Sequence, residues 1–174
     1  AFIGLHPAVS LELDLSPRRG DLLGENFDLA VRMGDLPVDS LLAARRIAVF
    51  SGGLYAAPAY LAERGDPVSP ADLERHAALR LLGRNGEATG WTLVCGERTW
   101  EGAPPARMVA NAPDLLINLA RAGAGIAAVP DYFAAPSVRR GELRRVLPDW
   151  CMPSHTAWAV FPGRRLMPAK TRAF

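Results

Sequence analysis

Short apolar runs alternate along this chain with helix-like apolar stripes, and this alternation restricts the fold more than any other feature. The clearest example lies in the middle of the sequence, where a helical pattern from Ala112 to Ala122 separates strand-like runs at residues 107–110 and 126–129. Asn111 is predicted to cap this helix, and Gly123 is predicted to end it. Strands that alternate with helices indicate the α/β class.

The N-terminal quarter predicts a strand, a short helix and a second strand. Residues 9–16 alternate apolar and polar side chains, which is typical of a half-buried strand, and residues 27–31 form a mostly apolar run. With a short helix beginning at Asp21, the pattern predicts a parallel βαβ unit. Residues 41–57 predict a further strand region that is interrupted at Gly52 and Gly53.

Length and charge exclude several classes of protein. The 174 residues are 49% hydrophobic, which is enough for one ordinary domain or for two small lobes. The formal net charge of +2 is too small for a nucleic-acid-binding face, because such a face needs a concentration of basic residues. The sequence has no apolar run of membrane-spanning length and no signal-peptide pattern at its first residues. We therefore expect a cytoplasmic protein without a membrane partner.

The residues that carry chemistry do not form a catalytic pattern. The three histidines have neither helical pair spacing nor acidic neighbours at metal-ligand spacing, and no nucleophile or glycine-rich phosphate motif is present. We expect no enzyme, no metal site and no cofactor. Cys95 and Cys151 lack zinc-ligand spacing and are either two inert thiols or a redox-sensing pair.

Several segments, in the same order and at similar spacing, resemble LysR-type transcription regulators. They are His6–Val9, Glu25–Gly34, Leu54–Leu61, Ala122–Pro130, Gly141–Leu143 with Val146–Trp150, and Pro168–Phe174. The similarity extends over essentially the whole chain and is specific to the effector-binding (substrate-binding) domain of that family.

The resemblance implies the fold of a type 2 periplasmic binding protein, with two α/β lobes joined by two crossover strands. Lobe one would comprise residues 1–55 and 131–174, and lobe two residues 56–130. It also implies that the helix-turn-helix DNA-binding domain and the N-terminal strand of lobe one lie outside this chain. The expected partners are a small-molecule effector, either an organic acid or an aromatic compound, and a second copy of the chain in a dimer.

The predicted effector site combines strand ends and helix starts, where free backbone N–H groups face a crevice. Each residue also has a simpler interpretation: a turn hydroxyl for Ser16, a salt bridge for Arg32, a helix cap for Asn111, and hinge packing for Tyr132. The predicted effector-binding residues are Ser16, Arg32, Asn85, Asn111, Ala112 and Tyr132.

Two other functions remain as alternatives. A stand-alone solute-binding protein of a transport system would share the fold, but the missing signal peptide and the LysR-type motifs disfavour it. An enzyme of the same architecture would need an acid–base pair or a nucleophile that the sequence does not offer. Fold alone does not separate these functions.

Overall fold

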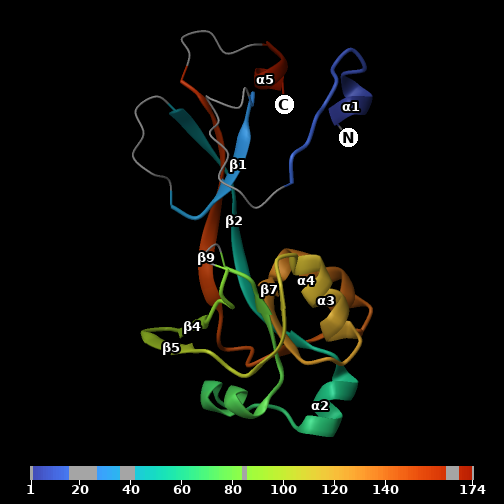
Figure 1. Cartoon of the computed structure of the whole chain (residues 1–174), viewed down its shortest axis with the longest axis vertical. Coiled ribbons are helices and arrows are strands. Elements are labelled where there is room, and N and C mark those ends of the chain that lie inside the picture. Colours follow the sequence, from blue (N-terminus) through green and yellow to red (C-terminus); the bar gives the residue numbers. More distant parts are fainter. Residues whose placement is uncertain (1, 16–26, 36–41, 84–85, 164–168, 174) are drawn as a thin grey trace. The chain divides into compact units, whose positions relative to one another are not determined.

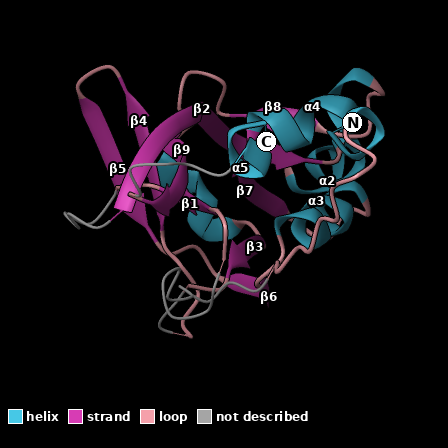
Figure 2. Ribbon diagram, turned by 90° about the horizontal axis from the view of Figure 1, so that it is seen from above, coloured by secondary structure: helices cyan, strands magenta, loops and turns pink. Residues whose placement is uncertain are grey.

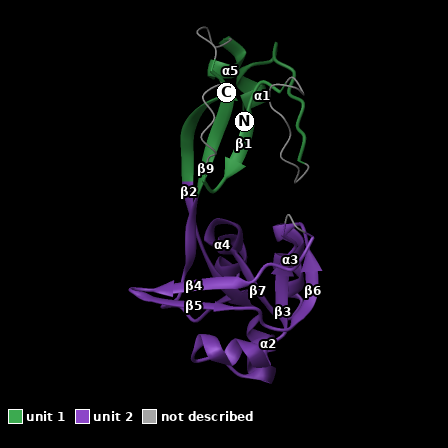
Figure 3. Cartoon of the chain, turned by 60° about the vertical axis from the view of Figure 1, so that its left-hand side comes forward, with its two compact units in different colours: residues 1–48, 156–174 green, residues 49–155 purple. Residues whose placement is uncertain are grey.

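The computed structural model describes residues 2–15, 27–35, 42–83, 86–163 and 169–173. The chain divides into two compact units, which Figure 3 shows in separate colours. Unit 1 comprises Ala1–Ala48 and Thr156–Phe174, and unit 2 is the continuous segment Val49–His155. The chain passes between them within strand β2 (Leu42–Ala56) and again within strand β9 (Met152–Pro162).

The compact units have different bounds from the predicted lobes. Residues 131–155, which the prediction places in lobe one, contain helix α4 (Asp131–Arg139) and strand β8 (Arg144–Val146) of unit 2. Strand β8 pairs antiparallel with the end of β2, with Leu54 opposite Val146, and the bounds of the functional lobes stay a prediction. Helix α4 also packs on helix α3 (Pro113–Arg121) and strand β7 (Ile126–Pro130).

The predicted N-terminal βαβ unit is wrong, as the described residues of unit 1 show. Helix α1 (Phe2–Leu5) ends before His6 and Pro7, and residues 9–15, which were predicted to form a strand, form neither helix nor strand and are mostly exposed. Strand β1 (Ala30–Met33) pairs antiparallel with β9, so Ala30 lies opposite Val160. An alternating pattern only permits a strand, and the partner of β1 comes from the far end of the chain. A short helix α5 (Ala169–Ala173) follows β9.

The sheet of the described residues has the strand order β1-β9-β2-β7-β3-β6, and β8 pairs with β2 beside this path. Figure 1 labels β1, β9, β2 and β7 of this order. Strands β3 (Ala78–Leu81), β6 (Ala106–Ala110) and β7 are mutually parallel, whereas β2 and β7 are antiparallel. Helix α3 makes the crossover from β6 to β7, as its sequence pattern predicts. Strands β4 (Trp91–Cys95) and β5 (Arg98–Gly102) form a separate hairpin, which Figure 2 shows in magenta.

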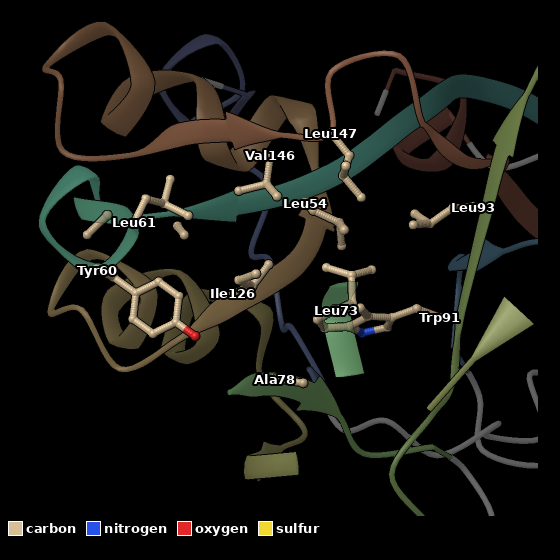
Figure 4. Packing of buried hydrophobic residues seen from close by; sticks show 12 residues of the cluster. Leu54, Tyr60, Leu61, Leu73, Ala78, Trp91, Leu93, Ile126, Val146 and Leu147 are labelled. Carbon is tan, nitrogen blue, oxygen red and sulfur yellow. The ribbon is translucent and has the colours of Figure 1, made fainter. Parts of the chain in front are cut away.

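Two hydrophobic cores cover the two faces of the sheet in unit 2. Adjacent residues of β2 enter different cores, because side chains alternate along a strand. Leu54 packs with Trp91 and Ile126, and this core includes helix α2 (Pro58–Arg64) and the 3-10 helix η1 (Pro70–Arg75) (Figure 4). Tyr55 packs on the opposite face, where α3 and α4 supply Leu116 and Ala134.

Local sequence signals place the helix ends of unit 2. Ser69 and Asp72 form a reciprocal capping box at the start of η1. Gly123, with φ of 77°, ends α3 through hydrogen bonds from Gly123 N to Ala120 O (3.0 Å) and from Ala124 N to Leu119 O (3.0 Å). One cap was predicted wrongly: the N-cap of α3 is Ala112, and no side chain caps it.

Candidate functional site

Four polar side chains meet where β2, β8 and the start of α4 come together in unit 2. Asp131 accepts hydrogen bonds from Ser51 Oγ (2.7 Å), Tyr55 Oη (2.6 Å) and Arg145 Nη1 (2.7 Å). Arg145 Nη1 also lies 3.0 Å from Tyr55 Oη, and its guanidinium is 5.3 Å from the centre of the Tyr55 ring. We call Ser51, Tyr55, Asp131 and Arg145 the polar cluster.

Strand register brings these residues together. Gly52 lies opposite Pro130 on β7, so Ser51 reaches Asp131 at the first residue of α4. Tyr55 lies opposite Arg145 on β8, and side chains directly opposite each other share a face of the sheet. Ser51, Gly53 and Tyr55 are alternate residues and therefore also share that face.

The Arg145 side chain occupies the space above Gly53, so a side chain at residue 53 would have to move it. A Cβ atom built on Gly53 would overlap the guanidinium group of Arg145, and a Cβ atom on Gly52 would lie 2.9 Å from Met152 Sδ. The sequence suggested that these two glycines interrupt the strand. In the structure they lie within the continuous strand β2. A glycine inside a strand often marks such a close approach.

The cluster holds a carboxylate in its charged form. Partial burial disfavours ionisation of Asp131, but hydrogen bonds from Ser51 and Tyr55, with the charge of Arg145, outweigh burial and lower its pKa. Burial and the hydrogen bond to Asp131 raise the pKa of Tyr55 to about 12, so its hydroxyl remains a donor at neutral pH. The side chains of Arg145 and Asp131 are 22% and 33% exposed, so solvent partly screens their attraction.

The second nitrogen of Arg145 connects β2 to the segment that enters β9. Nη2 lies 3.3 Å from the carbonyl oxygen of Gly52 and 3.2 Å from that of Trp150. It also lies 3.5 Å from Cys151 Sγ. One side chain thus contacts both segments near the points where the chain enters and leaves unit 2.

Three aromatic rings neighbour Ser51 and Asp131 in sequence; Tyr132 and Phe133 are exposed, whereas Phe50 is half-buried. The ring centres of Tyr132 and Phe133 are 5.6 Å apart at 76°, and those of Phe50 and Tyr132 are 6.4 Å apart at 74°. Both pairs have the edge-to-face geometry that aromatic quadrupoles favour. The side chain of Tyr132 is 72% exposed although it neighbours two other rings.

The predicted site residues have different surroundings in the structure. Ser16 and Asn85 lie outside the described residues. Arg32 is half-buried on β1 of unit 1, opposite Trp158. Asn111 and Ala112 are exposed and precede α3 in unit 2. Of the predicted residues, Tyr132 is the one that adjoins the polar cluster, and the role of each in effector binding stays a prediction.

Sequence reasoning missed all four members of the polar cluster. The signal that could have revealed the cluster is the glycine pair within an otherwise strand-forming run, because it implies a bulky neighbour above the strand. That signal does not identify the neighbour, since Arg145 is 90 residues from Tyr55 and 93 residues from Gly52 along the sequence.

A shallow depression elsewhere in unit 2 is a weaker candidate. Its volume is about 250 Å³, and it is lined by residues 74–77 and 105–107. None of the polar cluster lies in it, and its charged residues Glu74, Arg75 and Arg107 are exposed side chains. The polar cluster is therefore the better-built site.

The described residues contain no group of three or more His, Cys, Asp or Glu side chains that could hold a metal ion. Cys95 and Cys151 are free thiols on neighbouring segments, because Cys151 bridges to Val94. Directly bridged residues share a face, so Cys95 and Cys151 fall on opposite faces of this pairing. The described helices include none long and apolar enough to cross a membrane.

Comparison with known proteins supplies the identity of the domain. A family model described as "LysR substrate binding domain" matches residues 1–174. The chain belongs to this family. It is 36% identical over 177 residues to the HTH-type transcriptional regulator PtxR of Pseudomonas aeruginosa, covering 100% of this chain and 55% of the relative. It is 35% identical over 176 residues to an HTH-type transcriptional regulator of Xanthomonas campestris, covering 99% of this chain and 51% of the relative.

Solved structures agree with this assignment. The regulatory domain of CrgA, a LysR-type regulator from Neisseria meningitidis, matches with a TM-score of 0.86 and 26% identity, covering 99% of this chain and 84% of that chain. The full-length virulence activator AphB of Vibrio cholerae matches with a TM-score of 0.87 and 26% identity, covering 99% and 58%. The fold is therefore the predicted α/β fold of the type 2 periplasmic-binding-protein class. This LysR substrate-binding domain spans about half the length of the curated relatives that it matches.

Proposed function

We propose that this LysR substrate-binding domain senses a small-molecule effector in the inter-lobe cleft and transmits the binding event to the DNA-binding domain of a transcription regulator. The observation that carries the proposal is that the family match covers the whole chain but only about half of each regulator. An effector that binds one arrangement of the lobes more tightly shifts the population toward it. We propose the lobe bounds 55/56 and 130/131 for this movement.

We propose that the regulator is cytoplasmic and has no enzymatic activity. It acts as a homo-oligomer in which two copies of this domain form a dimer. The names of the regulators that it matches support transcription as its role. The proposal places DNA contacts outside this domain, because its formal net charge of +2 cannot neutralise many phosphates.

The test is a thermal-shift screen of the full-length regulator against small organic acids and aromatic compounds, followed by operator binding with and without each hit. A ligand that binds only the folded state raises the melting temperature, because binding adds to the free energy of unfolding. The proposal requires that at least one hit changes operator affinity. Hits that stabilise the protein without any effect on operator binding would favour the solute-binding alternative.

The effector-binding residues proposed for this cleft are those of the sequence prediction, and Asn111 offers a specific test. Asn111→Asp replaces an amide donor with a second negative charge close to Asp114 in sequence. We expect the affinity of an anionic effector to fall by about tenfold or more, which corresponds to about 1.4 kcal/mol. The fold should persist, because Asn111 is exposed and caps no helix. Unchanged affinity would remove Asn111 from the proposed site.

A further inference from the structure

The shallow depression of unit 2 lies at the amino-terminal ends of two parallel strands. Residues 74–77, which end η1 and precede β3, form one wall, and residues 105–107 at the start of β6 form the other. Ligands of open α/β sheets usually lie outside the carboxyl ends of the strands. A ligand in this depression would therefore occupy a second site, separate from the usual one.

Hydrogen bonds fix the backbone around the depression. Ala77 N donates to Tyr60 Oη (3.0 Å), and Ala77 O accepts from Ile126 N (2.9 Å). Ala78 N donates to Pro105 O (3.0 Å), and this bond joins the two segments that line the depression. A preformed site loses less conformational entropy on binding than a mobile one.

The pairing of β3 and β6 is irregular at Arg107. Ala78 lies opposite Ala106, but Leu79, the next residue of β3, lies opposite Met108. Arg107 is therefore an extra residue on β6, and such β-bulges often re-aim a side chain beside a functional site. Arg107 is exposed, lines the depression, and forms no hydrogen bond or ion pair with the described residues. Its fork of N–H donors is available to a ligand.

His76 supplies a further donor from the buried side of the depression. It is 7% exposed, and its Nδ1 lies 3.2 Å from Tyr60 Oη, which accepts a bond from Ala77 N. Nδ1 is the acceptor within reach of the Tyr60 hydrogen, so this network assigns the hydrogen of the neutral imidazole to Nε2. The described residues seal two unpartnered side-chain atoms from solvent, Arg145 Nε and Thr171 Oγ1, and His76 Nε2 is not one of them. Nε2–H is thus open to a ligand in the depression, which His76 lines.

We propose that this depression is an accessory site for a small oxyanion, either a carboxylate or a phosphoryl group, which His76 Nε2 and the guanidinium groups of Arg75 and Arg107 bind. Guanidinium groups recognise both kinds of oxyanion through paired N–H donors. Arg75 is 84% exposed and lies 3.6 Å from Asp72, so this loose contact leaves it able to turn toward a ligand. The volume of about 250 Å³ is below the range of roughly 300–1,000 Å³ that is usual for drug-sized ligands, which restricts the ligand to a small one. The site does not depend on the effector proposed for the inter-lobe cleft.

The charges around His76 make oxyanion binding dependent on pH. Three cations and three anions surround it, which are Arg64, Arg75, Arg107, Asp66, Asp72 and Glu74. Burial lowers the pKa of His76, and an anion at Nε2 opposes this effect because it favours the imidazolium. Tyr60 Oη has two lone pairs, so it can accept from Nδ1–H of the imidazolium as well as from Ala77 N. The oxyanion is therefore bound more tightly as the pH falls and His76 gains a proton.

The experiment follows thermal unfolding of the full-length regulator as sulfate or acetate replaces chloride at constant ionic strength and pH 7.5. An anion that binds the folded state raises the melting temperature. Sulfate has the geometry of a phosphoryl group and acetate is a carboxylate, so the anion that binds more tightly identifies the ligand class. Arg107→Ala should weaken that anion about fivefold or more, because charge-assisted hydrogen bonds are lost.

Arg139→Ala is the matched control, since it removes an exposed arginine of α4 that does not line the depression. Anion sites elsewhere in the regulator contribute equally to both variants, so the difference between them reports on the depression. The same anion dependence in Arg107→Ala and Arg139→Ala would show non-specific screening only and would overturn the proposal.

Two further variants test the direction of the effect. Glu74→Gln removes the acidic side chain of the depression and should tighten anion binding about twofold. Sulfate remains a dianion between pH 7.5 and 5, so its affinity for the wild type should rise about threefold or more over this range, and His76→Gln should remove the rise. Glu74 and Arg107 are exposed, so their variants should fold even where His76→Gln is less stable. Weaker binding by Glu74→Gln, or the same rise in His76→Gln as in the wild type, would contradict the proposed contacts.

Discussion

Substitution of Gly53 tests whether the Arg145 side chain determines the structure around the polar cluster. A Cβ atom at residue 53 overlaps the guanidinium, so Gly53→Ala must displace Arg145 from Asp131 and Tyr55. Gly53 does not adopt a positive φ, so the backbone itself tolerates alanine. The expected effect is therefore steric and acts through one side chain.

The magnitude follows from the contacts that are lost. A hydrogen bond to a charged group contributes about 1.5–3 kcal/mol. Because Arg145 and Asp131 are partly exposed, we expect the loss of the Arg145 contacts with Asp131 and Tyr55 together to stay within that range. Replacing glycine by alanine in a compatible backbone returns about 0.4–1 kcal/mol by restricting the unfolded chain. We expect Gly53→Ala to lower the free energy of unfolding by about 1–2 kcal/mol, the difference between these effects.

The assay is urea denaturation at pH 7 of the wild type, Gly53→Ala, Arg145→Ala and the double variant. If the overlap with Arg145 is the cause, Gly53→Ala should be neutral or slightly stabilising in the Arg145→Ala background, which a double-mutant cycle measures directly. Gly4→Ala is the control, because a Cβ atom at Gly4 meets nothing within 4 Å. The same loss from Gly53→Ala in both backgrounds would refute the reasoning.

Three further substitutions test other parts of the structure. Burial lowers the pKa of His76 below 6.5, so its contribution to stability is present above pH 6.5 and is lost as the pH falls from 6.5 through the lowered pKa of the folded state; His76→Gln should flatten the change in urea midpoint between pH 7.5 and 5. A Cβ atom on Gly125, which has φ of 156°, would overlap the carbonyl oxygen of Ala77, so Gly125→Ala should lower the melting temperature by several degrees, and an unchanged value in calorimetry would contradict the contact. The hydrogen bonds from Arg140 lower the pKa of Glu142 to about 2, so the stabilisation from this ion pair should be lost as the pH falls from about 4.5 toward 2; a wild-type and Glu142→Gln pair with the same acid-unfolding profile would argue against it.

Sequence predicted the parts of the fold that local chemistry determines. The glycine end of α3 at Gly123 follows from side chains within a few residues of it. The helix predicted from Ala112 to Ala122 corresponds to α3, in which Ile117 is buried whereas Leu115 is 47% exposed. Packing against the sheet determines which side of a helix is buried, and the apolar pattern of a single sequence indicates that side only approximately.

Pairing between distant segments could not be predicted in the same way. Residues 9–15 alternate as a strand should, yet their polarity pattern cannot specify a partner, and β1 pairs with β9 instead. The polar cluster has the same dependence on register, since 80 residues separate Ser51 from Asp131. Of the predicted site residues that the structure describes, only Tyr132 neighbours the cluster, because the strand register that places Asp131 beside Ser51 was unknown.

The passage of the chain through β2 and β9 has a consequence for the order in which the protein is made. Unit 2 is one continuous segment, so a ribosome delivers all of it before the last part of unit 1. Strand β1, although it is synthesised early, must wait for its partner residues around Val160, a delay of about ten seconds at about 5–20 residues per second. During translation unit 2 can fold first, and its folding brings the two halves of unit 1 closer together, so that the closing of the long loop between β1 and β9 requires less chain entropy.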